Sequence, residues 1–182
     1  MRHIHRRCAL HTLVALCSAM LSFAATAQTD DEEVRAFSER YARLVLAHDF
    51  KAAAALAHEG AVRRAGGVDA LGATMRASAR LDAELGAQAV DDQLGPVRRF
   101  AHGGSTVFIV EATRFIPSFP VPIEVDHLYV VSRNRTTEQL EMLDLGCVSV
   151  DWIAEIEPAF RGSALAAELV HRDLLGPAAA SN

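Results

Sequence analysis

The chain has 182 residues, of which 18 are basic and 23 are acidic, and its formal net charge at pH 7 is −5. This length suits a single domain with a hydrophobic core of its own. The acidic balance argues against nucleic acid as a partner, because a phosphate backbone is repelled unless basic residues gather on one face, and the arginines here occur as isolated pairs.

The N-terminus has the pattern of an export signal. Three arginines occur within the first seven residues, an apolar run covers residues 10–23, and Ala25-Thr26-Ala27 follows it. This order is typical of a secretory signal peptide, so we expect cleavage after Ala27 and a periplasmic or secreted protein. Loss of residues 1–27 removes three basic residues and no acidic one, which changes the net charge to −8. Because no later apolar run reaches about 18 residues, we expect no transmembrane segment after cleavage.

The first predicted helix follows the signal peptide. Apolar residues recur at steps of three and four from Val34 to Val45, which is the spacing of one face of an amphipathic helix. Tyr41 and His48 lie on the same stripe. The helix is expected to end at His48 and Asp49.

Two further helices are predicted before the sheet. Residues 50–58 are rich in alanine, the strongest helix former, and predict a short second helix that stops at Gly60. Val68 to Leu85 predicts a third helix. Gly86 then stands in the position where glycine commonly terminates a helix.

The second half of the chain predicts strands. Residues 88–101 form an irregular strand with a bend at Gly95-Pro96. Runs rich in β-branched and aromatic residues predict three more strands, over residues 106–116, 123–131 and 139–147. Short connections join them, a proline-rich corner at 117–122 and a polar turn at 133–138, so we expect an antiparallel meander.

The fold class expected from these elements is α+β. N-terminal helices pack on the concave face of a curved, mostly antiparallel sheet, within one domain over residues 28–160. A short helix at 150–156 closes this domain. Residues 161–182 are predicted as a C-terminal helix, over 163–175, followed by a disordered tail.

A few polar residues occupy positions that the pattern assigns to the interior. His127 lies between Val125 and Tyr129 on one strand face, and Glu111 lies on the preceding strand. One hypothesis is that His127, Glu111 and either Tyr41 or His48 converge in a pocket, where the carboxylate orients the imidazole as a general base. The commoner situation is that each polar end finds water or a backbone partner at the core edge.

The order of elements also has a counterpart in a known family. Residues 41–56 contain the end of the first predicted helix, the pair Asp49-Phe50 and an alanine-rich segment. Residues 67–71 begin the third predicted helix, and residues 128–158 contain the last predicted strands and the short helix after them. Over residues 31–160 this layout resembles small exported bacterial proteins of the nuclear-transport-factor-2-like (cystatin-like cone) superfamily. The turn at Ser132 to Arg135 lacks the Asp-Gly-Gly of such proteins. The resemblance implies the cone fold and carries over no catalytic residue.

Three functions are compatible with this sequence. The leading one is a non-catalytic exported domain that binds a small ligand or a protein in or near the cone. The residues expected to line its pocket are His127, Glu111, Tyr41, His48 and Tyr129. The second is a small lyase or isomerase with an acid–base site in the same pocket. The third is a structural module that forms a homodimer through the sheet face. No nucleotide-binding glycine pattern and no zinc ligand pair occurs, so we expect no cofactor and no metal.

Overall fold

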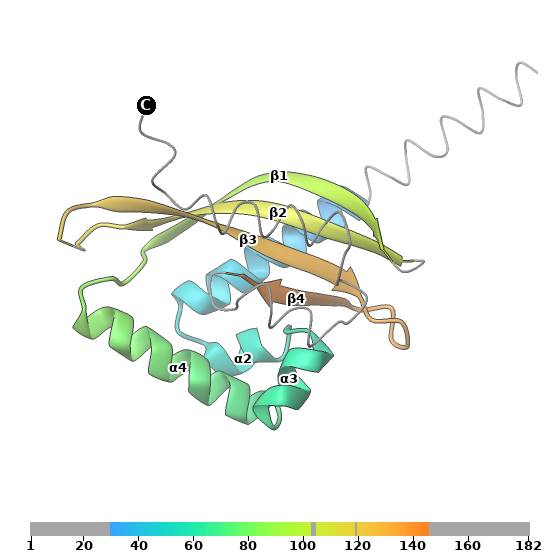
Figure 1. Ribbon diagram of the computed structural model, residues 1–182, viewed down its shortest axis with the longest axis horizontal. Coiled ribbons are helices and arrows are strands. Elements are labelled where there is room, and N and C mark those ends of the chain that lie inside the picture. The colour runs from blue at the N-terminus through green and yellow to red at the C-terminus, as the bar shows by residue number, and fades with distance from the viewer. Residues whose placement is uncertain (1–29, 103–104, 119, 146–182) are drawn as a thin grey trace, which may run out of the picture. The chain divides into compact units, whose positions relative to one another are not determined.

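The computed structural model describes residues 30–102, 105–118 and 120–145 (Figure 1). The predicted signal peptide and the predicted helices at 150–156 and 163–175 lie outside these residues. A helix over residues 30–46 opens the described chain. The elements after it are α2 (Phe50–Ala54), α3 (Glu59–Ala65), α4 (Val68–Glu84), β1 (Asp91–His102), β2 (Ser105–Ile116), β3 (Ile123–Arg133) and β4 (Leu140–Asp144). The fold class is α+β, as predicted.

The four strands form one antiparallel sheet in the order β1-β2-β3-β4. This order confirms the predicted meander, in which each strand pairs with its neighbour in sequence. Both predicted connections are present, the proline-rich corner between β2 and β3 and the polar turn between β3 and β4. The last strand is shorter than predicted, since β4 ends at Asp144.

The predicted bend in β1 is a register shift between Leu94 and Val97. Pro96 has no amide hydrogen to donate to the sheet, so the ladder is interrupted at this point. The first helix uses the interruption, because Arg35 Nη2 donates to the carbonyl oxygen of Gly95 at 2.7 Å. The bulge therefore attaches the first helix to the edge strand.

His48 lies beyond the end of the first helix and not on its buried stripe. It adopts the left-handed conformation, with φ of 60°, and its side chain is exposed. The His48 amide donates to the carbonyl of Val45 at 3.0 Å and the Asp49 amide donates to that of Leu44 at 2.9 Å. These two bonds are those of a Schellman motif with His48 in the position after the cap, which explains why the periodic pattern does not extend to it.

The single helix predicted over residues 50–58 is wrong, because two short helices replace it. α2 ends at Ala54, and Gly60, predicted to stop the helix, lies inside α3. Between them the backbone pairs with β4: the His58 amide donates to the Met142 carbonyl at 2.8 Å, and the Met142 amide donates to Leu56 at 2.9 Å. Pairing with β4 gives these backbone groups hydrogen-bond partners, and this gain outweighs the helix propensity of the alanines.

The third predicted helix is confirmed as α4. Gly86 follows its cap with φ of 71°, so it terminates the helix as predicted. Gly72, the buried residue of α4, permits a close approach to α2, since a Cβ at this position would lie 3.0 Å from the carbonyl oxygen of Phe50. Among the described helices, none has the length and the apolar character needed to cross a bilayer.

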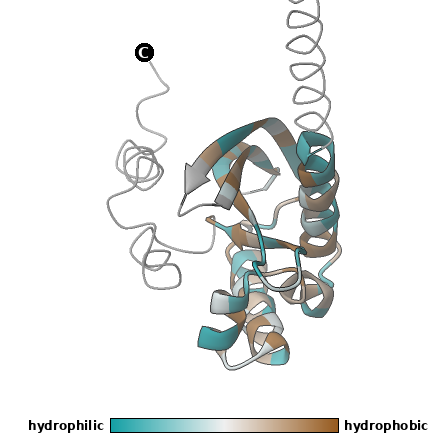
Figure 2. Cartoon of the chain, turned by 90° about the vertical axis from the view of Figure 1, so that its right-hand side faces the viewer, coloured by the Kyte–Doolittle hydropathy of each residue, from teal (hydrophilic) through white to brown (hydrophobic). Residues whose placement is uncertain are grey.

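Hydrophobic residues occur along the strands and helices (Figure 2), and they form two core clusters on opposite faces of the sheet. The helix-facing side carries the larger core, in which Phe108, Val110, Tyr129, Val131 and Met142 pack with residues of the first helix and α2. The opposite side buries a second set, which contains Val107, Ile109, Leu128, Val130 and Leu143 together with Ala61 of α3. Both strand faces are therefore apolar at the centre of the sheet.

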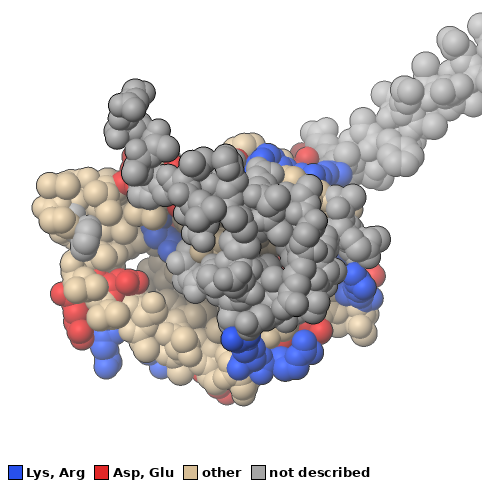
Figure 3. Space-filling model, in the orientation of Figure 1, with Lys and Arg blue, Asp and Glu red and all other residues tan. Residues whose placement is uncertain are grey.

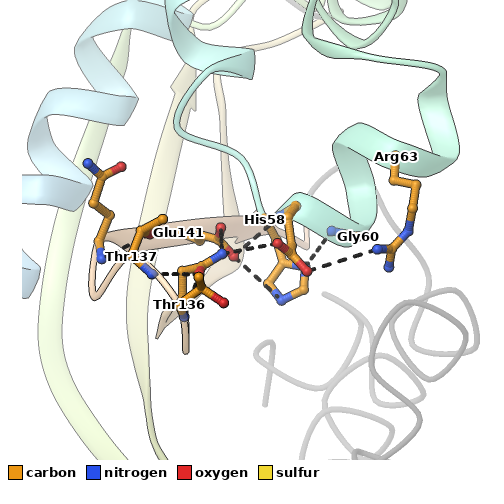
Figure 4. A network of polar contacts seen from close by, with 9 residues as sticks. His58, Gly60, Arg63, Thr136, Thr137 and Glu141 are labelled. Carbon is orange, nitrogen blue, oxygen red and sulfur yellow. Dashed lines mark hydrogen bonds and ion pairs between the residues drawn. The ribbon is translucent and has the colours of Figure 1, made fainter.

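A polar network attaches α3 to the hairpin between β3 and β4 (Figure 4). Asn134 Nδ2 donates to Glu141 Oε1 at 2.7 Å and to Glu59 Oε2 at 3.1 Å. His58 Nδ1 accepts from the Gly60 amide at 3.0 Å and so caps α3. The junction is only partly buried, since the side chains of His58 and Glu141 are 13% and 14% exposed whereas that of Glu59 is 62% exposed.

Candidate functional site

Five polar side chains form a row across the helix-facing side of the sheet, one or two from every strand. They are Asp92 of β1, Arg114 of β2, His127 and Tyr129 of β3, and Asp144 of β4. The strand register places them on one face, since Asp92 is opposite Arg114 and Tyr129 is opposite Asp144, while His127 is opposite Ala112. We refer to these residues as the five-residue cluster.

The cluster is almost completely removed from solvent. The side chains of Asp92, His127 and Asp144 are 1%, 4% and 5% exposed, and Tyr129 is fully buried. The side chain of Arg114 is 19% exposed. Because a buried charge is costly unless it is paired and hydrogen-bonded, the members of this cluster depend on one another.

Asp92 and Arg114 are the centre of the cluster. Arg114 Nη2 lies 3.0 Å from Asp92 Oδ2, 3.3 Å from the Tyr129 hydroxyl and 3.8 Å from Asp144 Oδ2. The Tyr129 hydroxyl donates to Asp92 Oδ2 at 2.5 Å. One carboxylate oxygen and one guanidinium nitrogen thus hold together side chains from four strands.

His127 Nε2 lies between a donor and an acceptor. It is 3.3 Å from Arg114 Nη2 and 3.4 Å from Asp92 Oδ1. An unprotonated Nε2 accepts from the guanidinium, whereas a protonated Nε2 faces the carboxylate. The imidazole therefore has two chemically sensible proton arrangements in the same position.

The surroundings set the charge of the other members. Burial raises the pKa of Asp92, but the contacts with His127, Tyr129 and Arg114 outweigh it, so the pKa of Asp92 lies below its ordinary value. Burial lowers the pKa of Arg114, but the charge of Asp144 and the contacts with Tyr129 and Asp92 raise it by more. The pKa of Arg114 therefore lies above its ordinary value, and the guanidinium keeps its proton. Burial and the two carboxylates raise the pKa of Tyr129, so the phenol stays neutral.

The formal charges of the five side chains do not cancel among themselves. Asp92 and Asp144 supply two carboxylates and Arg114 supplies one guanidinium, so the sum is −1 when His127 is neutral. A ligand that brings a second negative charge into this space would be repelled. A neutral hydrogen-bonding group is the addition that the cluster accommodates.

Three buried atoms of the cluster have no hydrogen-bond partner among the described residues. They are Asp92 Oδ1, Arg114 Nε and His127 Nδ1. More than nine in ten buried polar groups in proteins are satisfied, and an unmade bond costs roughly 1–3 kcal/mol. These three atoms are the positions in the cluster at which a further polar group, from a water molecule or a ligand, would make hydrogen bonds.

The structure brings three of the five sequence-predicted residues together. His127 and Tyr129 belong to the cluster, and their rings meet edge to face with centroids 4.8 Å apart. Tyr41 of the first helix packs edge to face on Tyr129 at 5.6 Å. The predicted proximity of a carboxylate to His127 is present, but the carboxylate is that of Asp92.

The other two residues lie elsewhere. Glu111 is opposite Leu128 and so points to the other side of the sheet, where its Oε1 lies 3.4 Å from Arg98 Nη2. His48 lies beyond the first helix and its Nε2 is 3.1 Å from Gln88 Nε2. Neither contributes to the five-residue cluster.

Sequence reasoning missed Asp92 and Asp144 and left Arg114 unused. Alternation along β2 already assigns Arg114 to the face of Phe108 and Val110, but only the strand register identifies this face with that of His127. Among the described residues no group of three or more histidine, cysteine or acidic side chains is arranged to hold a metal ion.

Comparison with protein-family models, with curated proteins and with solved structures found no match to this chain.

Proposed function

We propose that the chain is an exported domain that binds a small neutral ligand in the five-residue cluster. The observation that carries this proposal is a set of three buried atoms without a hydrogen bond, Arg114 Nε, His127 Nδ1 and Asp92 Oδ1, the last of which has only the ion-pair contact with His127 Nε2 at 3.4 Å. The set combines an acceptor, a donor and an imidazole nitrogen that can serve as either. A primary amide, with one carbonyl oxygen and one NH2 group, complements such a set.

Charge favours a neutral ligand over an anionic one. The buried Asp92 carboxylate repels a further anion, and the low dielectric of the interior strengthens this repulsion. Arg114 is the most exposed member of the cluster, with a side chain that is 19% exposed. A ligand would therefore meet the guanidinium first.

Export and the cone arrangement are part of the same proposal. The basic and apolar N-terminus followed by Ala-Thr-Ala supports export. The first helix and α2 pack on one side of an antiparallel sheet that carries polar residues on that same side, which supports the cone-type arrangement of the nuclear-transport-factor-2-like superfamily. The homodimer alternative receives less support, since the apolar residues at the centre of the other sheet face are already buried within one chain.

Benzamide and benzoate test the proposal, because they have nearly the same shape and differ in charge. We expect benzamide to shift the amide and imidazole NMR signals of residues 127–129 and to bind at least about tenfold more tightly there than benzoate, which corresponds to about 1.4 kcal/mol. His127→Gln should weaken this binding, because a side-chain amide cannot place a donor where Nδ1 lies. His48→Asn, a change outside the cluster at a residue whose left-handed conformation asparagine tolerates, should leave it unchanged. Equal shifts with both probes, or none with benzamide, would overturn the proposal.

A second candidate is catalysis of proton transfer, the lyase or isomerase alternative. The pair His127 Nε2 and Asp92 Oδ1, at 3.4 Å, favours it, because a carboxylate beside an imidazole can support it as a general base. The test is exchange of the α-hydrogens of cyclohexanone for deuterium in D2O, followed by proton NMR. Catalysis requires faster exchange with the unmodified chain than with His127→Gln, and equal rates would rule it out for this ketone class.

A further inference from the structure

A second hollow lies away from the five-residue cluster, between the end of the first helix, α2 and α4. Its volume is about 320 Å³, and it is lined by His48, Phe50, Arg76, Ala79, Arg80 and Ala83. Arg76 and Arg80 are one helical turn apart on α4, so their side chains leave the helix on the same side. The hollow thus combines two guanidinium groups with small and aromatic apolar walls.

Neither arginine is neutralised within the described chain. Arg76 and Arg80 have no carboxylate within ion-pair distance and no hydrogen bond from their side chains. Other exposed cations do find acidic partners, as Lys51 does with Asp69 at 2.8 Å and Arg63 with Glu59 at 3.9 Å. In an acidic chain with a net charge of −5, two adjacent unpaired guanidinium groups on one hollow are a local excess of positive charge. Figure 3 shows basic and acidic side chains close to one another at several places on the face drawn.

The aromatic wall is held in a defined position. The His48 ring stacks on the Phe50 ring with centroids 5.4 Å apart and planes 23° from parallel. Gln88 Nε2 lies 3.1 Å from His48 Nε2 and fixes the other edge of the imidazole. The left-handed backbone at His48 thus places its ring against Phe50, and both residues line the hollow together with the two arginines.

We propose that this hollow binds a small carboxylate that bears a flat apolar group. Arg76 and Arg80 would hold the carboxylate, since a guanidinium binds carboxylate oxygens through two parallel hydrogen bonds and such charge-assisted bonds are about twice as strong as neutral ones. The apolar group would lie against Ala79, Ala83 and the ring pair. This site is independent of the five-residue cluster and has the opposite charge preference.

Titration with benzoate tests the inference, followed by the NMR amide signals of Ala79 and Ala83. We expect benzoate to shift these signals, and the double variant Arg76→Gln, Arg80→Gln to weaken its binding by at least about tenfold. Glutamine forms helices well, so the double variant should fold normally. Arg63→Gln removes one exposed cation of α3 that already has an acidic partner, and it should leave the affinity unchanged.

Three further probes decide the ligand class. Benzamide should bind here more weakly than benzoate, and acetate and inorganic phosphate should fail to displace benzoate at equal concentration, because they lack the apolar group. The inference is overturned if benzoate leaves Ala79 and Ala83 unshifted, if the double variant keeps full affinity, or if acetate competes as well as benzoate. Because benzamide shifts at residues 127–129 report only on the cluster, failure at one site leaves the other to be judged separately.

Discussion

Replacement of Asp92 by alanine should lower the free energy of unfolding by about 3–5 kcal/mol, the loss typical of breaking a buried ion pair. The carboxylate is 1% exposed and accepts from Arg114 and Tyr129, so its removal leaves a buried guanidinium and a phenol without their acceptor. A single domain has about 5–15 kcal/mol of stability in total, so this change is a large fraction of it. Urea denaturation of the two proteins measures the difference.

Asp126→Ala is the matched control for this prediction. Asp126 is an exposed carboxylate on β3 whose Oδ1 accepts from the Thr113 hydroxyl at 2.9 Å. Its replacement should cost no more than about 1 kcal/mol. Similar losses at both positions would contradict the paired, buried role of Asp92.

The pH dependence of Asp92→Asn supplies a readout that a merely steric loss would not give. Because the pKa of Asp92 in the folded chain lies below its unfolded value, its ionisation stabilises the fold fully above about pH 4. This contribution is lost as the pH falls through the folded pKa. The free energy of unfolding of the unmodified chain should therefore decrease more steeply below about pH 4 than that of Asp92→Asn. Parallel acid limbs would contradict the assignment.

Replacement of Tyr129 by alanine should cost about 4 kcal/mol or more, near the upper end for a buried aromatic residue. Tyr129 is fully buried, packs on the rings of Tyr41 and His127, and joins Arg114 to Asp92. The alanine variant therefore loses both a core side chain and a hydrogen-bond donor. Chemical denaturation with a probe of tertiary structure measures the loss.

Tyr129→Phe separates the two parts of this effect. Phenylalanine keeps the ring contacts and removes the hydroxyl, so we expect a loss of about 1–3 kcal/mol, the cost of leaving buried polar partners unsatisfied. If Tyr129→Phe were neutral, the hydroxyl would play no part in holding Asp92 and Arg114. If it cost as much as Tyr129→Ala, packing against Tyr41 and His127 would contribute nothing, which would contradict its place in the core.

Much of the fold follows from local patterns in the sequence. Runs of β-branched and aromatic residues located β2 and β3, glycine and proline located the bulge in β1 and the end of α4, and short connections implied the antiparallel order. The segment after Phe50 was predicted wrongly because alanine favours a helix locally, whereas pairing of residues 56–58 with β4 is a long-range interaction. Propensity cannot register a partner that lies about 85 residues away along the chain.

The site was predictable only in part. His127 and Tyr129 were identifiable because a polar group on an apolar face is conspicuous, but their carboxylate partner was assigned to Glu111. Alternation along a strand shows which residues of that strand share a face. Which residues of two neighbouring strands lie on the same face of the sheet depends on the register between them. Asp92 escaped notice because it precedes the bulge, where alternation within β1 is interrupted. Asp144 escaped because its match to Tyr129 depends on the length of the turn before β4.

A crystal structure of the chain grown with benzamide tests the central claim most directly, since that claim concerns the unpartnered atoms of the five-residue cluster. We expect the amide group of benzamide to lie within hydrogen-bond distance of at least one of Asp92 Oδ1, Arg114 Nε and His127 Nδ1. The contacts of Arg114 and Tyr129 with Asp92 Oδ2 should be retained. Benzamide bound elsewhere, with these three atoms still without ligand contacts at a saturating concentration, would contradict it. The cluster would then be a structural network that joins four strands.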